Sequence, residues 1–194
     1  YLKELQESGI DIIPTVFVEK NSALELSMLI PNQWQKLVIK PAVSGGAYLT
    51  RLFDRSEMAN VLREYTPIAA ERDLLIQPFM AEIQEQGELS LLFFGGAFSH
   101  AVLKRPVAGE FRVQSEFGGN YRAIEVSAEL IATCEKIIAA FGGELIYARV
   151  DGIIASGKFL LMELELIEPD LYFDYDKNAK RRYLAALEAA LAKL

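Results

Sequence analysis

The sequence has very few of the residues that carry nucleophilic or redox chemistry. Its 194 residues include one cysteine, Cys134, and one histidine, His100. A single cysteine cannot form an internal disulfide, which fits a reducing compartment. Nucleophilic triads and histidine-rich metal sites need more such residues, so both classes are disfavoured. We expect structural roles for Cys134 and His100, and chemistry that depends on Lys, Arg, Asp and Glu.

Long apolar runs and an excess of positive charge are also missing. No apolar run reaches the ~20 residues that a membrane-spanning helix needs, and no signal peptide is recognisable. The net charge of −7 argues against nucleic acid as the main partner, because phosphate contacts need clustered Lys and Arg. We therefore expect a cytoplasmic protein with neither membrane nor nucleic acid as partner. An anionic nucleotide remains compatible, because local residues set the field in a cleft.

The composition is that of a globular protein, with 52% hydrophobic and 24% charged residues. Its periodicity predicts an α+β fold in two parts, residues 1–75 and the more strand-rich 76–194. Residues 106–120 are expected to form a mobile loop. Strands are expected over 14–18, 36–40, 48–52, 74–80, 89–94, 97–105, 145–154 and 159–166. Helices are expected over 2–8, 22–29, 56–71, 127–141 and 174–194.

The most informative segment is the predicted hairpin of residues 145–166. Alternation along its strands divides the side chains between two faces. The apolar face is expected to hold Val150, Ile154, Leu160, Met162, Leu164 and Leu166. The polar face is expected to hold Arg149, Asp151, Glu163 and Glu165. A three-residue loop at 156–158 would set this register, whereas a plain two-residue loop would move Asp151 to the other face. The apolar alternation favours the three-residue loop.

Three carboxylates on one surface repel one another unless a cation lies between them. Hard oxygen ligands suit Mg²⁺, which binds one or two carboxylates together with substrate phosphates. Asp151, Glu163 and Glu165 are therefore candidate metal ligands. The alternative is a solvated face on which Arg149 pairs with Glu165.

Two further segments indicate a nucleotide site. Lys40 ends an apolar strand, where a buried cation needs an anion. The small residues that follow can bring backbone N–H groups close to phosphate oxygens; they are Ser44, Gly45, Gly46 and Ala47. In the second segment, Pro78 interrupts a strand beside Gln77, Phe79 and Met80, leaving backbone that could bind an adenine edge. The alternatives are an ordinary turn with an edge lysine and a kinked edge strand.

Taken together and in this order, these segments resemble the ATP-grasp superfamily. The resemblance is to glutathione synthetase-like and ribosomal-protein-modification-type ligases and, less specifically, to the ATP-grasp cyclo-ligases of cycloserine biosynthesis. It covers residues 14–169, and residues 104–119 resemble the basic loop that precedes the family's Gly-Gly. It implies two α+β subdomains with the nucleotide between them. It also implies a preceding N-terminal domain, which is not recognisable here.

The resemblance implies a role for each matching residue. Lys40 would contact the α-phosphate and adenine, and the loop of residues 44–47 would close over the β- and γ-phosphates. Glu88 would hold the ribose hydroxyls. The adenine pocket would be lined by Gln77, Phe79 and Met80. The catalytic cations would be Lys104, Arg112 and Arg149, and the Mg²⁺ ligands Asp151, Glu163 and Glu165. The third ligand departs from the family, in which Asn is common at that position.

The implied activity is an ADP-forming ligase that joins a carboxylate to an amine through an acyl-phosphate. ATP and Mg²⁺ are the implied cofactors, with Mn²⁺ as a substitute, and the partners are small-molecule carboxylates and amines. A homo-oligomer is compatible with the resemblance. Two alternatives stay open at this point: an ATP-grasp kinase, and a non-catalytic or truncated nucleotide-binding module.

Overall fold

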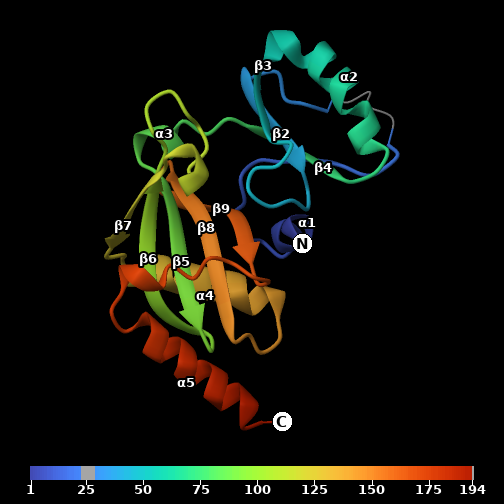
Figure 1. Cartoon of the computed structure of the whole chain (residues 1–194). Coiled ribbons are helices and arrows are strands. Elements are labelled where there is room, and N and C mark those ends of the chain that lie inside the picture. The colour runs from blue at the N-terminus through green and yellow to red at the C-terminus, as the bar shows by residue number, and fades with distance from the viewer. Residues whose placement is uncertain (23–28, 194) are drawn as a thin grey trace. The chain divides into compact units, whose positions relative to one another are not determined.

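A computed structural model describes residues 1–22 and 29–193, so the helix expected over 22–29 falls outside the described residues. The chain divides into a larger unit, Tyr1–Ile12 with Ala81–Leu194, and a smaller unit, Ile13–Met80 (Figure 1). The predicted boundary at residue 75 therefore differs from the observed one. The N-terminal segment belongs to the larger unit because the Leu161 N–H donates to the Asp11 carbonyl, 2.9 Å away, and Ile12 bridges Leu161 in parallel.

The smaller unit is a four-stranded antiparallel sheet in the order β1-β4-β2-β3. Its strands are β1 (Val16–Val18), β2 (Lys36–Pro41), β3 (Arg51–Asp54) and β4 (Leu74–Pro78). β3 begins later than expected because Ala47 and Leu49 have positive φ angles of 56° and 53°, which are not extended. The core of this unit includes Leu37, Ile39, Phe53, Val61, Leu74 and Ile76.

One helix, α2 (Met58–Ala69), follows β3 through a 3-10 turn, η2 (Arg55–Glu57). Asp54 caps this turn, and its side chain and that of Glu57 form a reciprocal capping box. The helical segment thus begins one residue before the predicted start at residue 56. α2 buries Val61, Leu62, Tyr65 and Ala69 in the core of the smaller unit.

The larger unit is a five-stranded antiparallel sheet in the order β7-β6-β5-β8-β9 (Figure 1). Its strands are β5 (Glu88–Phe94), β6 (Ala97–Arg105), β7 (Asn120–Ile124), β8 (Tyr147–Ala155) and β9 (Lys158–Glu165). The predicted Gly95-Gly96 turn joins β5 and β6, and both glycines have the positive φ that a two-residue hairpin turn needs. β7 was missed because its pattern is mostly polar, as befits an edge strand.

The helices of the larger unit are α1 (Leu2–Glu7), α3 (Glu82–Glu85), α4 (Ala128–Phe141) and α5 (Ala179–Leu191). α4 begins where predicted, since the Leu130 N–H donates to the Ser127 hydroxyl. α5 begins five residues later than expected because the chain first forms a 3-10 turn, η4 (Phe173–Tyr175). Within the described residues, no helix has the length and hydropathy needed to cross a membrane.

The β8–β9 hairpin reaches the expected pairing by a different route. Asp151 lies opposite Glu163 and Arg149 opposite Glu165, as predicted. The prediction of a three-residue loop was wrong. Ala155 pairs with Lys158 across a two-residue turn, and the register shifts between Asp151 and Gly152. The bulge restores the register that a plain two-residue turn would have changed.

The bulge also changes the apolar face near the turn. Gly152 is opposite Leu161, so Leu161 rather than Leu160 shares the face of Val150. A Cβ at Gly152 would lie 2.4 Å from the Leu160 carbonyl oxygen and 2.4 Å from the Phe159 ring. Only glycine fits where β8 and β9 approach so closely. A glycine inside a strand is a sequence signal for a bulge.

Candidate active site

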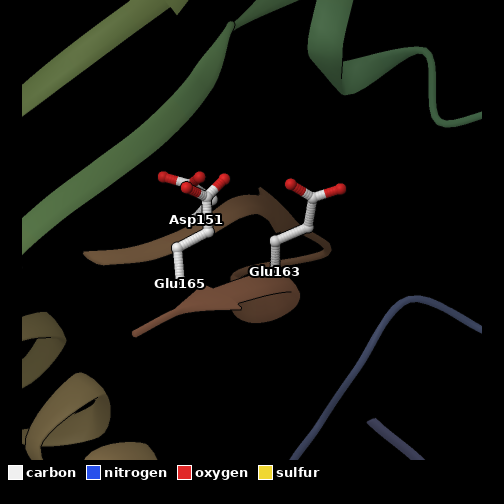
Figure 2. Close-up of side chains that lie close together, drawn as sticks. All are labelled: Asp151, Glu163 and Glu165. Atoms are coloured by element: carbon white, nitrogen blue, oxygen red, sulfur yellow. The ribbon is translucent and has the colours of Figure 1, made fainter. Parts of the chain in front are cut away.

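Three carboxylates rise from the paired β8 and β9 strands on one face of the hairpin. Asp151, Glu163 and Glu165 each offer an oxygen, and these atoms lie within 4.8 Å of one another. Figure 2 shows the three side chains turned the same way. Asp151 is only 1% exposed, whereas the two glutamates are half-buried. The predicted metal ligands are therefore brought together by the fold.

Arg149 lies beside two of these carboxylates, Asp151 and Glu165. Its Nε lies 3.0 Å from Asp151 Oδ2, and its Nη2 contacts both Asp151, at 2.9 Å, and Glu165. The Arg149–Glu165 pair was the alternative interpretation of this face. The structure contains both that pair and the carboxylate cluster. Burial raises the pKa of Glu165 to about 7, with Arg149 acting in the opposite direction.

Lys104 provides a second, deeper cation. β6 places it opposite Glu88 on β5, and its ammonium pairs with Glu88 and lies 3.6 Å from Asp151 Oδ1. Its side chain is only 5% exposed. Burial opposes its charge, but Asp151 and Glu88 outweigh burial and raise the pKa of Lys104 above its usual range. Burial likewise acts against the Asp151 charge, yet Lys104 and Arg149 hold the pKa of Asp151 below its usual range.

Ser90 completes the buried part of the cluster, and no sequence argument had pointed to it. β5 places Ser90 opposite Asp151, and its hydroxyl donates to Asp151 Oδ1. Glu88 was expected at the ribose, not beside Asp151. Glu88 and Ser90 are two residues apart on β5, so they share a face. Two polar residues alternating with leucines in a central strand were the available signal.

Arg112, the third expected cation, is held within its own loop. It donates from Nε and Nη2 to the Glu110 carboxylate, at 3.1 and 2.7 Å. Its guanidinium carbon lies 3.5 Å from the centre of the Phe117 ring. The hydrogen bond from Arg112 lowers the pKa of Glu110 to about 2. A 3-10 turn, η3 (Ser115–Phe117), adds some structure to the expected loop.

In the smaller unit, Lys40 and its loop are far more accessible. Lys40 is half-buried near the end of β2, opposite Leu75. The strand ends at Pro41, and Ser44, Gly45 and Gly46 are exposed. An exposed loop with left-handed backbone at Gly46 and Ala47 has backbone donors available to a ligand.

The segment around Gln77 lies at the C-terminal end of the smaller unit. The Gln77 side chain is buried and donates to the Thr15 hydroxyl at 2.9 Å. β4 lies between β1 and β2, so the alternative of an edge strand was wrong. Pro78 nevertheless lies beyond the Val16–Ile76 pair that ends the β1 ladder, so its missing N–H removes no bond there. Phe79 and Met80 are half-exposed at the end of this unit.

Comparison with known proteins identifies the family. The model of the prokaryotic glutathione synthetase ATP-grasp domain matches residues 5–161. The chain belongs to this family. It is 26% identical over 209 residues to the cycloserine biosynthesis protein DcsG of Streptomyces lavendulae, covering 98% of this chain and 68% of that protein.

Solved ATP-grasp ligases share the fold. The crystal structure of D-cycloserine synthetase DcsG matches with a TM-score of 0.86 and 24% identity, covering 98% of this chain and 69% of that one. D-alanine–D-alanine ligase from Bacillus anthracis matches at 0.70 and 18%, covering 96% and 63%. The ATP-grasp ligase PsnB, complexed with a phosphomimetic variant of its minimal precursor, Mg and ADP, matches at 0.70 and 14%, covering 96% and 56%. These structures show the fold, and the family match identifies the chain as an ATP-grasp ligase domain.

His100 and Cys134 take no part in the carboxylate cluster of this ATP-grasp domain. Cys134 is fully buried in α4, and burial raises the pKa of its thiol to about 12. His100 is 6% exposed, with Nδ1 2.9 Å from the Ser99 hydroxyl and Nε2 3.1 Å from the Tyr172 carbonyl. Both therefore have the structural roles that the sequence suggested.

Proposed function

We propose that this ATP-grasp domain uses Mg-ATP to activate a carboxylate and join it to an amine, releasing ADP and phosphate. The observation that carries the proposal is the cluster of buried Asp151 with half-buried Glu163 and Glu165, with Arg149 beside it. Phosphoryl transfer needs positioning and charge neutralisation rather than a protein nucleophile. A site made of fixed carboxylates and cations meets that need.

The residues present fit a magnesium ion. Oxygens on opposite sides of an octahedral Mg²⁺ are about 4.2 Å apart, comparable to the 4.8 Å limit of this cluster. One arginine leaves Glu165 with a raised pKa, so a further cation would favour its charged form. Asp151, Glu163 and Glu165 would hold Mg²⁺, or Mn²⁺ in its place. The ion would neutralise charge on the nucleotide phosphates.

The proposed reaction has two steps, formation of an acyl-phosphate and its displacement by the amine. An oxygen of the substrate carboxylate attacks the γ-phosphorus, the bond to the bridging oxygen breaks, and ADP departs with the electron pair. The amine nitrogen then attacks the acyl carbon, phosphate leaves, and the amine loses a proton. Arg149, with its charge secured by Asp151, would stabilise the phosphoryl group in transfer. We assign Lys104 to fixing Asp151 and Glu88, because so little of its side chain is accessible.

Residues of the smaller unit would hold the nucleotide. Lys40 would contact the α-phosphate, the loop of residues 44–47 the outer phosphates, and Phe79 and Met80 the adenine. The support is the exposure of the loop and of the two apolar side chains. Gln77 would contribute through its backbone, because Thr15 already engages its side chain. Arg112 would face the substrates from its loop after releasing Glu110.

The first test follows ADP release with pooled carboxylates and amines. ADP that appears only when both substrate classes are present supports the ligase. A phosphorylated product that persists without amine supports a kinase instead, and nucleotide binding without any turnover supports a non-catalytic module. Identifying the active pair defines the substrates.

The second test is Mg-dependent nucleotide binding, measured by calorimetry. Asp151→Asn and Glu163→Gln should each weaken it at least about 10-fold, the scale expected when a metal site loses a ligand or its support. Glu188→Gln, which removes an exposed carboxylate from α5, is the control and should bind like the wild type. Unchanged affinity in both cluster variants would remove the metal assignment.

A further inference from the structure

The segment that follows β9 turns back onto Arg149. Arg149 Nη1 donates to the Asp170 carbonyl at 3.1 Å, and the Tyr172 ring centre lies 5.3 Å from the guanidinium carbon. The other donors of Arg149 meet Asp151 and Glu165. Two carboxylates therefore bind Nε and Nη2 of the guanidinium, and the segment after β9 binds Nη1 and places the Tyr172 ring near the guanidinium carbon.

Tyr172 has an unusual backbone conformation. Its φ of 48° and ψ of 41° are left-handed, a region that non-glycine residues seldom occupy and that occurs where surrounding structure imposes it. Here the Tyr172 N–H donates to Asp170 Oδ1 at 2.9 Å. The Tyr172 carbonyl accepts from His100 at 3.1 Å. The residue is thus fixed at both its N–H and its carbonyl.

The Tyr172 ring is fixed as firmly as the backbone. Tyr172 is 7% exposed and packs in a cluster with Leu92 and Val102. The Tyr121 ring meets it edge-on, with centroids 5.6 Å apart, and the Tyr175 ring does so at 6.0 Å. An aromatic face held in this way can position a cation placed over it.

His100 connects this arrangement to the C-terminal helix α5. The Tyr172 carbonyl can only accept, so neutral His100 carries its proton on Nε2 and donates it there. His100 Nδ1 then accepts from the Ser99 hydroxyl, which accepts from Nε of Arg182 on α5 at 2.9 Å. A defined chain of donors runs from α5 to Tyr172.

We infer that Tyr172 is a positioning residue for Arg149. It holds the guanidinium in the orientation in which it faces Asp151 and Glu165, and His100 and α5 hold Tyr172 in turn. The inference rests on the proposed function, in which Arg149 stabilises the phosphoryl group. Small displacements of such a group reduce the rate strongly while binding changes little.

The test compares Tyr172→Leu, which removes the ring, with Tyr172→Phe, which keeps it. The first measurement is ADP release from Mg-ATP in the presence of the carboxylate and amine pair that the substrate test identifies. Tyr172→Leu should lower kcat about 10-fold or more with KM for Mg-ATP within about twofold, and Tyr172→Phe should stay within about twofold of the wild type. Tyr175→Leu is the matched comparison, because Tyr175 belongs to the same cluster, and it should lower kcat by less than Tyr172→Leu does.

The second measurement is the NMR signal of the Arg149 Nε–H, assigned by its loss in Arg149→Lys. Buried and bonded to Asp151, this proton should exchange slowly in the wild type and in Tyr172→Phe, and fast in Tyr172→Leu. Asp170→Ala removes the exposed carboxylate that accepts the Tyr172 N–H, and it should speed exchange even if Tyr172→Leu does not fold.

Two results would overturn the inference. One is slow exchange and full kcat in both Tyr172→Leu and Asp170→Ala. The other is an equal loss of kcat in Tyr175→Leu, which would assign the effect to the aromatic cluster as a whole. The exchange measurement needs no turnover. A wild type that shows slow exchange but releases no ADP with any carboxylate and amine pair would therefore count against the proposed function alone.

Discussion

The two units treat charge in opposite ways. The larger unit buries Lys104 and Arg149 together with Glu88 and Asp151, so that each of these charges has an opposite charge beside it. The smaller unit leaves Lys40 half-buried and its following loop exposed. Buried charges need partners within the protein, whereas water screens charges near the surface. We therefore expect substitutions in the larger unit to affect folding as well as binding, and those in the smaller unit to affect binding almost alone.

Lys104→Met is expected to have the largest effect on stability and therefore tests this difference between the units most strongly. It leaves Glu88 and Asp151 buried with one cation fewer, which should lower the free energy of unfolding by about 3–5 kcal/mol. Lys158→Met, at an exposed position on β9, should change it by less than about 0.5 kcal/mol. Denaturant unfolding measures both.

A second variant checks the cause of the loss. Adding Glu88→Gln to Lys104→Met removes the stranded carboxylate and should recover part of the lost stability. If Lys104→Met unfolds at the wild-type denaturant concentration, the buried cluster does not depend on this cation and the contrast between the units fails.

Lys40→Met is the counterpart in the smaller unit. It should weaken ATP binding by about 10-fold or more, the value of a charge-assisted hydrogen bond to phosphate. The midpoint of unfolding without nucleotide should shift little, because the side chain is only partly buried. Calorimetric titration with ATP and denaturant unfolding of the same sample separate the two effects. A stability loss as large as that of Lys104→Met would contradict the comparison.

The smallest expected effect concerns His100. Burial lowers the pKa of His100 from its usual value, so below about pH 6.5 the unfolded chain binds a proton more tightly than the folded protein does. This contribution to stability is complete above that pH and decreases as the pH falls through it. The wild type should lose more stability than His100→Gln between pH 7.5 and 5.5.

Subtracting the two pH profiles removes the contributions of other groups, including Glu165, whose pKa of about 7 lies in the same range. Parallel profiles for the wild type and His100→Gln would show that the folded protein protonates His100 as readily as the unfolded chain does.

Local signals in the sequence were reliable where one residue type decides the structure. Asp54 begins a helical segment, Ser127 caps α4, and Gly95-Gly96 turns the chain between β5 and β6. Elements without such a signal were missed. α3 is a single turn, and the polar strand β7 exists because it pairs with the Ala101–Arg105 part of β6.

The part of the candidate site that depends on a local signal was predicted from the sequence, and the rest was not. Alternation along β8 and β9 placed Asp151, Glu163 and Glu165 on one face, because side chains on a strand alternate regardless of what surrounds them. The two-residue turn with its bulge was not predicted, since it depends on how Phe159 packs over Gly152. Ser90 and Lys104 joined the cluster only through the pairing of β5 with β6 and β8.

By itself, the sequence determined which chemistry is available: carboxylates and cations on defined strands, with one histidine and one cysteine. Strand period and turn chemistry are local properties, so the residues next to one another in the chain suffice to specify them. Only the tertiary structure decided that Lys104 is buried against acids and that Tyr172 lies over Arg149. Those contacts join strands and turns far apart in the chain, and their burial sets the charge of each group.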